Sequence, residues 1–555
     1  MASKPDSTNF SRQTGKARRP AEENNGPECR AWRRRILEVF VFQAIGLALA
    51  AWRYRHALNP DAISYLRIAS YYGAGNTRLA ISGYWSPLLS WLLVPVLKLG
   101  LSPLVAARIV MAVSGVVFLG GTWRVLNRFG VSQSVLLWGL WTAALISIPW
   151  SVENITPDLM GAGLAGFALA ETVSTFWVSA PRAAFVCGLC WGIAYLDKSV
   201  YLPMAVLTSI GLAALRYRDQ KRDWRLIVRS VALTFAGIAL VVSPWIGVIS
   251  VKCGELTFSR SARYNHTLIG PPEIKRNFAF DDGYAKPEPG RITNWEDIDM
   301  SPPDWSPIGS LDNALFQIFT ILYTVPKVVT MLTNLFLGFP VLLAATVWSW
   351  CHPWRRGDLP GRFWRAMLPI AVVGGLYLPN YLLVQDRRYF YVTFPFLFVA
   401  AAEWLAIQGQ WLPAWIKRHS LFLLSLAFVV PAGYRNALDP APDRTAGECA
   451  WQLARRFSDA HLAGTIAGNA SLPGGRTGLY LAFLINQPWY GGESQPSPAS
   501  LRASGANLIV LERTSDVARE VAQDPAFQNL DRQLFSSAQE ARRFPVEVFR
   551  NLSSE

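Results

Sequence analysis

The sequence predicts an all-α polytopic membrane domain of about eleven transmembrane helices, followed by a small C-terminal α/β domain outside the membrane. The 555 residues are 51% hydrophobic and only 16% charged, whereas a soluble domain carries about 25% charged residues. Apolar runs of about 20 residues, the length that crosses a bilayer, recur between residues 36 and 434. After residue 434 these runs end, and short helix-like and strand-like stretches replace them.

The first predicted span, Ile36–Trp52, follows a polar, arginine-rich tail over residues 1–35 that is predicted to be disordered and cytoplasmic. No small-residue cleavage site follows this run, so it is interpreted as a retained span and not as a signal peptide. The predicted spans cover roughly residues 36–52, 104–124, 132–150, 158–178, 183–197, 199–215, 228–250, 332–350, 365–384, 391–409 and 419–434.

Basic residues between the spans predict their orientation. If the N-terminus is cytoplasmic, every inside connection is basic: "CRAWRRR", "RVLNRFG", "SAPRA", "RYRDQKRDWR", "HPWRRGDLPGRFWR" and "WIKRHS". The acidic clusters "DDGY" and "WEDID" then lie outside. The net charge of +15 is thus spread over short clusters, and nucleic-acid binding is not predicted. We expect a cytoplasmic N-terminus and a periplasmic C-terminus.

Three regions are expected outside the membrane on the far side. Outer loops over residues 53–103 and 251–312 interrupt the membrane domain, which is taken as residues 36–434. Residues 435–555 alternate helix-like stretches, such as "ECAWQLARRFSDA", with short strands, such as "GTIAG" and "NLIVLE". This alternation predicts a small periplasmic α/β domain.

The stretch "NPDAISYL" has the composition of a helix start. Asn59 is the expected N-cap, Pro60 the first helical residue and Asp61 an acidic residue in the first turn, with Tyr65 on the same side. One interpretation is that Asp61 only offsets the helix dipole, worth about 0.3–1 kcal/mol. The other is a catalytic carboxylate, which gains weight because Asp158 in "TPDLM" opens a later span on the same face.

Cations are expected on that face too. Arg387 and Arg388 in "VQDRRYFYVTFPF" lie where the positive-inside rule disfavours them, and charge near the bilayer is usually functional. An arginine pair can bind a lipid phosphate, but it can also pair with Asp386 or extend to the headgroups. Lys198 in "YLDKSVYLP" is either a local partner of Asp197 or a further cation for a phosphate.

Together, these groups suit the transfer of a sugar from a polyprenyl phosphate to an acceptor hydroxyl. One aspartate can take the hydroxyl proton, and we predict Asp61 as this base, with Asp158 as the second catalytic candidate. The leaving phosphate is a weak base, so cations and not a second acid should stabilise it. Arg387, Arg388 and Lys198 are the predicted phosphate-binding residues, and the reaction is expected to invert the sugar.

The order of these motifs resembles the GT-C glycosyltransferases, the superfamily of protein O-mannosyltransferases, bacterial aminoarabinose transferase and oligosaccharyltransferases. The resemblance covers roughly residues 36–410 and rests on "NPDAISYLRIA", "GYWSPLLSWLL", "TPDLM", "LDKSVYLP" and "RRYFYVTFPF". It implies a GT-C-like fold with a periplasmic active site in a bacterial inner membrane. It also implies substrate-binding roles for Tyr65, Tyr84, Trp85 and Tyr389.

The implied partners are a polyprenyl-phosphate sugar donor, a lipid, glycan or protein acceptor, and the lipid bilayer. No cofactor is assigned. A divalent metal stays an open alternative, although no D-x-D motif is assigned in the outer loops to support it. A transporter or flippase of a lipid-linked glycan is the alternative function, although no internal repeat typical of transporters is found. A non-catalytic membrane scaffold is the third class considered.

Overall fold

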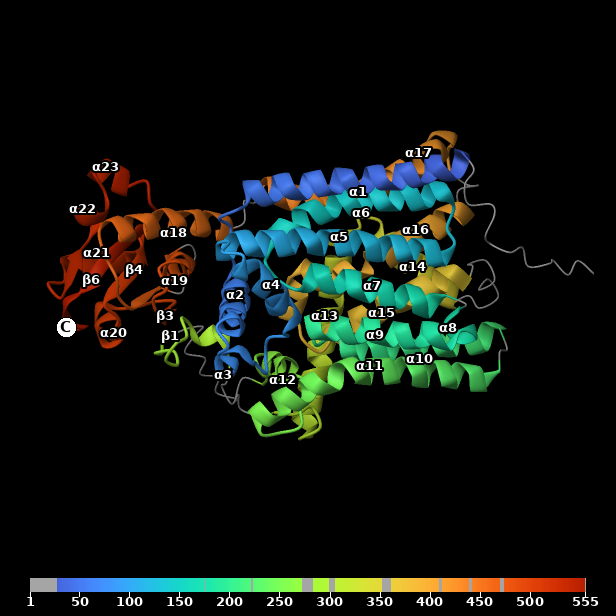
Figure 1. Ribbon diagram of the computed structural model, residues 1–555, viewed down its shortest axis with the longest axis horizontal. Coiled ribbons are helices and arrows are strands. Elements are labelled where there is room, and N and C mark those ends of the chain that lie inside the picture. The colour runs from blue at the N-terminus through green and yellow to red at the C-terminus, as the bar shows by residue number, and fades with distance from the viewer. Residues whose placement is uncertain are drawn as a thin grey trace, which may run out of the picture.

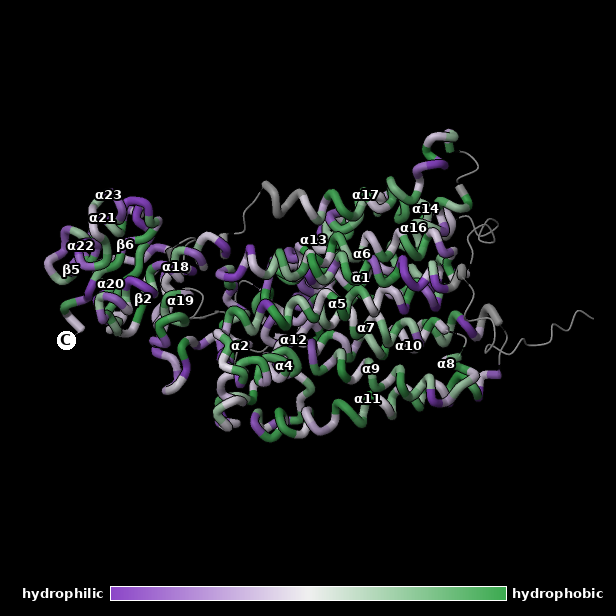
Figure 2. Tube along the Cα trace, turned by 45° about the horizontal axis from the view of Figure 1, so that its top comes forward, coloured by the Kyte–Doolittle hydropathy of each residue, from purple (hydrophilic) through white to green (hydrophobic). Residues whose placement is uncertain are grey.

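The computed structural model describes residues 27–174, 176–220, 223–271, 283–298, 305–351, 361–408, 412–438, 442–469 and 474–554. A large helical bundle and a smaller α/β unit lie end to end along the longest axis (Figure 1). Hydrophobic positions are frequent along the bundle helices, while the smaller unit carries more hydrophilic positions (Figure 2). The predicted combination of a mainly helical membrane domain and a small sheet is confirmed.

The bundle contains the long apolar helices. They are α1 (Pro27–Arg53), α5 (Pro103–Phe129), α6 (Gln133–Glu153), α7 (Asp158–Val173), α9 (Pro181–Asp197), α10 (Tyr201–Gln220), α11 (Trp224–Cys253), α13 (Leu311–Leu335), α14 (Phe339–Cys351), α15 (Gly361–Tyr377), α16 (Phe394–Gln408) and α17 (Ala414–Leu438). Seven stretches of the described residues are long and apolar enough to cross a membrane, namely α5, α6, α11, α13, most of α1 and α17, and Arg387–Ile407.

Two sequence-based boundaries differ from the observed helices. The sequence predicts no span over residues 312–331, whereas α13 covers Leu311–Leu335. The predicted span 332–350 is divided between the end of α13 and α14. The amide of Leu337 donates to the carbonyl of Ala427 in α17, which holds the break between the two helices. The predicted tail also extends too far, because α1 begins at Pro27; residues 1–26 lie outside the described residues.

Small residues bring the bundle helices into close contact. A Cβ atom added at Gly121 of α5 would collide with the carbonyl oxygen of Gly163 in α7. The same holds for Gly188 of α9 against the backbone of Thr234 in α11. Such contacts are typical of membrane helices, whose association depends on backbone approach more than on burial of apolar surface. They hold α7 against α5 and α9 against α11; the predicted site residues Asp158 and Lys198 lie at the start of α7 and just after α9.

Short elements, all but α8, cover one end of the bundle. Those of the first outer region are α2 (Pro60–Gly73), α3 (Thr77–Ala80) and α4 (Leu88–Lys98). The others are α8 (Phe176–Ser179), which lies at the opposite end, α12 (Ser261–Thr267), β1 (Gly283–Tyr284), η1 (Asn294–Glu296), η3 (Leu383–Gln385) and η4 (Arg387–Thr393). Since α2, α12, η1 and η4 meet at the same end, residues far apart in sequence can share one site there (Figure 1).

The α/β unit is built on a six-stranded mixed sheet in the order β1-β3-β2-β4-β6-β5. β2 pairs in parallel with β3 and β4, while the outer pairs are antiparallel. Its elements are α18 (Pro442–Asp459), β2 (Ile466–Asn469), α19 (Gly474–Leu484), β3 (Trp489–Glu493), α20 (Pro498–Ala503), β4 (Leu508–Glu512), α21 (Asp516–Gln523), β5 (Phe527–Asn529), α22 (Asp531–Leu534), α23 (Ala538–Ala541), β6 (Val546–Asn551) and η6 (Leu552–Ser554). The central strand β2 is buried along its whole length, as expected for a strand covered on both faces.

The second outer region belongs partly to this sheet. β1 pairs with β3, the amide of Ala285 donates to the carbonyl of Tyr490 at 2.6 Å, and the amide of Trp489 donates to the carbonyl of Ile292 at 2.7 Å. Residues 283–298 are therefore a strap that runs from the sheet to α2. The sequence predicts this region as an outer loop and not as part of the sheet, because its partner strand lies about 200 residues away, beyond the reach of any local pattern.

Candidate active site

A cavity of about 660 Å³ opens at the end of the bundle that carries α2 and α12. Its walls come from α2, the turn at residues 84–86, the start of α7, the α9–α10 connection, α12, η1, the end of α15 and η4. Eight of the nine predicted site residues line it: Asp61, Tyr65, Tyr84, Trp85, Asp158, Lys198, Arg388 and Tyr389. Two carboxylates and two cations thus meet at the helix ends, as the sidedness of the sequence motifs predicted.

Asp61 is held in the first turn of α2. Asn59 has the extended backbone of an N-cap, but its side chain does not cap the helix; instead it accepts a hydrogen bond of 2.8 Å from the amide of Ile155. This bond ties the start of α2 to the α6–α7 connection. The indole of Trp295 donates to Oδ1 of Asp61 at 3.4 Å, and Arg388 Nη1 lies 2.9 Å from Oδ2. The Asp61 side chain is 21% exposed and faces the cavity.

Lys198 pairs with Asp158 and not with its neighbour in sequence. Its Nζ atom forms an ion pair with Oδ1 of Asp158, the first residue of α7, and lies 3.9 Å from the ring centroid of Tyr389. The side chain of Asp197 is fully buried at the end of α9. The local Asp197–Lys198 pair considered from the sequence is therefore not formed, because Lys198 leaves the helix and turns toward α7.

Arg388 joins three carboxylates. Its Nη1 atom lies 2.9 Å from Asp61, and its Nε atom lies 2.9 Å from Asp386 and 3.7 Å from Asp158. The Arg388 side chain is 15% exposed, so this charge is mostly removed from solvent while one edge of the guanidinium faces the cavity. Burial raises the pKa of the Asp386 carboxyl, and the Arg388 guanidinium beside it opposes that shift.

Arg387 is the exception among the predicted residues, because it does not line the cavity. Its side chain is 3% exposed, its Nη2 atom lies 2.8 Å from Glu153 at the end of α6, and its Nη1 atom donates to the carbonyl of Pro431 in α17. A 3-10 helix has about three residues per turn, so consecutive side chains point in different directions. Arg388 therefore faces the cavity, whereas Arg387 ties η4 to α6 and α17.

Aromatic side chains form the wall beside Asp61. The rings of Tyr65 and Tyr84 pack edge-on against Trp85, at centroid distances of 5.0 and 4.7 Å, and Trp295 lies 5.7 Å from the same ring. Burial raises the pKa of the Tyr65 and Tyr84 phenols well above their usual range, so both keep their protons at neutral pH. The wall thus offers broad apolar faces with hydroxyl groups at their tips.

Two further contributors to the cavity wall were not predicted from the sequence. α12 supplies Arg263, Asn265 and His266, and the strap supplies Trp295. The His266 ring stacks on Trp305 at 4.4 Å, and its Nε2 atom lies 2.7 Å from Gln317 of α13. A lone histidine and a lone arginine in a long polar segment carry no motif, so only their position beside the cavity identifies them.

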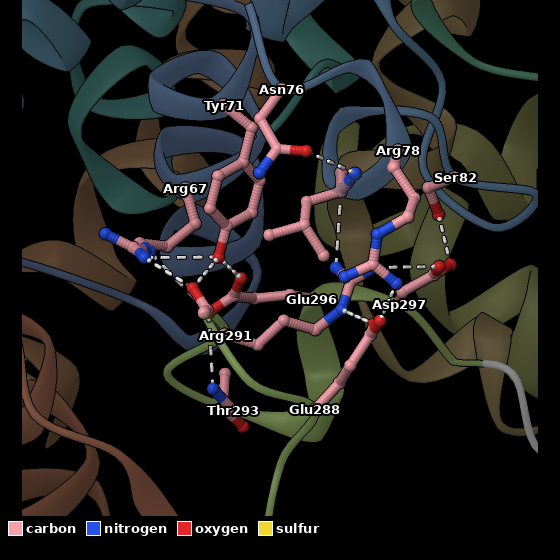
Figure 3. A network of polar contacts seen from close by, with 12 residues as sticks. Arg67, Tyr71, Asn76, Arg78, Ser82, Glu288, Arg291, Thr293, Glu296 and Asp297 are labelled. Atoms are coloured by element: carbon pink, nitrogen blue, oxygen red, sulfur yellow. Dashed lines mark hydrogen bonds and ion pairs between the residues drawn. The ribbon is translucent and has the colours of Figure 1, made fainter. Parts of the chain in front are cut away.

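A buried polar network fixes the strap against α2 (Figure 3). Glu296 is fully buried; it accepts a hydrogen bond from the Tyr71 hydroxyl, and its Oε1 atom lies 3.7 Å from Arg67 and accepts from the amide of Ile292 at 2.7 Å. Burial raises the pKa of the Glu296 carboxyl, although Tyr71 and Arg67 oppose the shift.

The neighbouring Asp297 completes this anchor (Figure 3). It accepts from Arg291 at 3.1 Å and from Ser82 at 3.1 Å, and it pairs with Lys252 at the end of α11. Trp295 lies next to both acidic anchors, and its carbonyl accepts from the indole of Trp85 at 2.9 Å. The network therefore determines where the Trp295 indole meets Asp61.

The donor set does not fit a divalent metal. Asp61 and Asp158 are joined by the Arg388 guanidinium, and Lys198 occupies the other oxygen of Asp158, so two cations already fill the space between the carboxylates. No group of three or more His, Cys, Asp or Glu side chains that could hold a metal occurs among the described residues. One aspartate pair at D-x-D spacing does exist, at positions 297 and 299, which corrects the sequence assignment. Asp297 is paired with Arg291 and Lys252, and Asp299 lies outside the described residues.

No protein-family model matches the sequence, and no curated protein matches it either. Among solved structures, the fold is similar to that of ArnT from Cupriavidus metallidurans, whose crystal structure contains undecaprenyl phosphate. The two chains are 17% identical, the match covers 94% of this chain and 98% of ArnT, and the TM-score is 0.53. At this identity the likeness shows a common fold.

Two further structures show weaker similarity. The archaeal oligosaccharyltransferase AglB from Archaeoglobus fulgidus, solved with an inhibitory peptide and a dolichol phosphate, is 11% identical over 86% of this chain and 69% of its own, with a TM-score of 0.48. The mycobacterial arabinofuranosyltransferase AftD is 13% identical over 92% of this chain and 40% of its own, with a TM-score of 0.40. The structural neighbours are GT-C glycosyltransferases, and the predicted resemblance to that superfamily is confirmed at the level of the fold.

Proposed function

We propose that this protein is an inverting membrane glycosyltransferase that moves a sugar from a polyprenyl-phosphate donor to an acceptor hydroxyl in the 660 Å³ cavity. The observation that carries the proposal is the meeting of Asp61, Asp158, Lys198 and Arg388 in one cavity at the helix ends. The shared fold with ArnT, which was crystallised with undecaprenyl phosphate, supports the choice of a polyprenyl-phosphate donor.

Arg388 is the proposed donor-phosphate ligand. A phosphate oxygen can replace Asp61 on the exposed edge of the guanidinium, while Asp386 retains its hold on Nε. This exchange frees one oxygen of Asp61 without displacing its other oxygen from the Trp295 indole. Donor binding would thus prepare the base as well as the leaving group.

Asp61 is the proposed general base. It takes the proton of the acceptor hydroxyl, the hydroxyl oxygen forms a bond to the anomeric carbon, and the bond from that carbon to the phosphate oxygen breaks. The electron pair leaves with the polyprenyl phosphate, whose added charge Arg388 and Lys198 stabilise. A single displacement of this kind inverts the anomeric centre.

Asp158 is better suited to positioning than to proton transfer. Its side chain is only 4% exposed and contacts both Lys198 and Arg388. A carboxylate that holds two cations at a fixed separation pre-organises them for a phosphate. Asp61 is five times as exposed and is therefore the more accessible base.

A transporter is the less suitable function for this geometry. Transporter sites typically lie near the middle of the membrane, on interrupted helices. Here Asp158 starts α7, Lys198 follows the end of α9, and Arg388 precedes α16. The orientation inferred from the basic segments would put this helix end, together with the C-terminal unit, on the periplasmic side of a bacterial inner membrane.

The proposal is tested by binding of the carrier lipid to the full chain purified in detergent, with undecaprenyl phosphate, the lipid that the proposed reaction releases, as the probe. Arg388→Ala should weaken binding about 10- to 100-fold, since a hydrogen bond to a charged group contributes about 1.5–3 kcal/mol. Arg388→Lys should restore binding only partly, because lysine lacks the planar fork. Arg502→Ala is the control, since Arg502 pairs with Asp524 in the α/β unit. Unchanged binding by Arg388→Ala would contradict the proposal.

A further inference from the structure

A second cavity, of about 730 Å³, lies where the chain leaving α1 meets the α/β unit. Its walls come from residues 53–56, from α18 and from residues 540–545. α18 packs closely on the first of these segments: a Cβ atom at Gly447 would collide with the carbonyl oxygen of His56, and the ring centroids of His56 and Trp451 are 4.1 Å apart. The cavity is thus built into the contact between the two parts of the fold.

The wall of this cavity is strongly basic. Five arginines line it, together with two glutamates: Arg53, Arg55, Arg444, Arg456, Arg543, Glu448 and Glu540. Arg456 lies 2.6 Å from Glu540, and hydrogen bonds from the Ser536 hydroxyl and from Arg456 lower the pKa of Glu540 to about 2, so this pair is charged and self-neutralised. Four arginines then face a single glutamate, Glu448.

No ion pair joins a carboxylate of the described residues to any of these four arginines, which are Arg53, Arg55, Arg444 and Arg543. Arg53 and Arg444 both lie over the ring of Tyr54, at 6.0 and 4.8 Å from its centroid, and both line the cavity. Among the described residues, Arg55 donates to the carbonyl of Trp52, and its guanidinium lies 4.7 Å from the centroid of the Trp52 ring. Like charges gathered around one cavity repel each other, and an anion bound among them removes that cost.

The cavity also lies at the edge of the apolar surface of α1. Leu49 is 66% exposed and Trp52 is 71% exposed, as expected for side chains that face lipid, and the exposed apolar surface of α1 ends at Arg53. Tryptophan at the end of a spanning helix is typical of the membrane–water interface. The arginines therefore stand at the level of lipid headgroups, beside a lipid-facing helix.

We infer that this cavity binds a phosphate-bearing anion at the membrane surface, held by Arg53, Arg55, Arg444 and Arg543. Guanidinium groups bind phosphate through paired, charge-assisted hydrogen bonds, and four of them can surround a headgroup larger than a single phosphate. The volume falls within the range of about 300–1,000 Å³ that is usual for small-molecule sites. This inference does not depend on the proposed transferase activity.

The test compares two phosphate sources on the full chain in detergent. Phosphatidylglycerol and phosphatidylcholine are titrated, and bound lipid is counted by native mass spectrometry; inorganic pyrophosphate is titrated by calorimetry. The Arg55→Gln, Arg543→Gln double variant should lose at least about tenfold in affinity for whichever phosphate source the wild type prefers. Both side chains are exposed, so the thermal midpoint should not change.

Arg542→Gln is the matched control, because Arg542 is exposed and adjacent in sequence but does not line the cavity. A phosphatidylglycerol preference that the double variant loses and the control keeps would identify a lipid headgroup as the ligand. Pyrophosphate binding with the same pattern would identify a soluble phosphate instead. Equal affinities in wild type and double variant for both probes, or an equal loss in Arg542→Gln, would overturn the site.

Discussion

Replacing Asp61 by asparagine separates a catalytic base from a carboxylate that only stabilises the helix start. The change preserves shape but removes the charge partner that lies 2.9 Å from Arg388. The stability cost should stay within about 1.5–3 kcal/mol, the contribution of one hydrogen bond to a charged group. Arg388 is not left unpaired, because Asp386 remains 2.9 Å from its Nε atom. The helix-dipole effect adds at most about 1 kcal/mol.

If Asp61 is the catalytic base, Asp61→Asn should lower the transfer rate far more than its small cost in stability would explain. Loss of a general base typically lowers a rate about 10²- to 10⁴-fold. Binding of undecaprenyl phosphate should be unchanged or tighter, since Asp61 no longer competes for the exposed edge of Arg388. Transfer is measured as loss of sugar from polyprenyl-phosphate sugars in membranes that contain each variant.

Asp386→Asn is the matched control for this experiment. Asp386 holds the same guanidinium at the same 2.9 Å distance but does not line the cavity, so its variant removes an ion pair of Arg388 without removing the proposed base, and its transfer rate should fall far less than that of Asp61→Asn. Near-normal transfer by Asp61→Asn with an inactive Asp158→Asn would mean that the wrong carboxylate has been named. Normal transfer by both variants would refute the glycosyltransferase mechanism itself.

Three further outcomes are expected besides the loss of donor-lipid binding in Arg388→Ala. Arg387→Ala should lower stability by up to about 3–5 kcal/mol in thermal unfolding, because it removes the charge partner of Glu153, whose side chain is 11% exposed and keeps the hydrogen bond from Tyr391; Glu153→Gln in the same chain should recover part of the loss. Glu296→Gln should slow transfer while leaving undecaprenyl phosphate affinity unchanged, because Glu296 anchors the strap and not the phosphate; reduced lipid affinity would contradict that role. Reporter fusions after residues 222 and 438 should report opposite sides of the membrane, and the same side for both would refute the orientation.

Much of the cavity wall could be predicted because its signals are local. A proline and an aspartate at the start of a helix are visible within three residues, and they place Asp61 and Asp158 at helix ends. The side of the membrane follows from counting basic residues between apolar runs. Because helix ends on one side converge, side chains from different helices could be expected to meet without knowing how the helices pack.

The pairing of these side chains was beyond sequence reasoning. Proximity in sequence suggested Lys198 with Asp197, yet Lys198 pairs with Asp158, 40 residues away. The difference between Arg387 and Arg388 depends on the direction of two neighbouring side chains in η4, which no hydropathy pattern encodes. Trp295 and the strap are held at the site by contacts with α2, β3 and α11, which were not predicted from the sequence.

The contact between Asp61 and Arg388 gives the proposed reaction an order. Before the donor binds, Asp61 is ion-paired to Arg388 and is poorly placed to accept a proton. The donor phosphate, a phosphodiester with one negative charge, competes for the same guanidinium edge through paired, charge-assisted hydrogen bonds. Asp61 is then released toward the acceptor, with the Trp295 indole still on its other oxygen. Because the strap that carries Trp295 is also paired with β3, the C-terminal unit takes part in setting the position of the base.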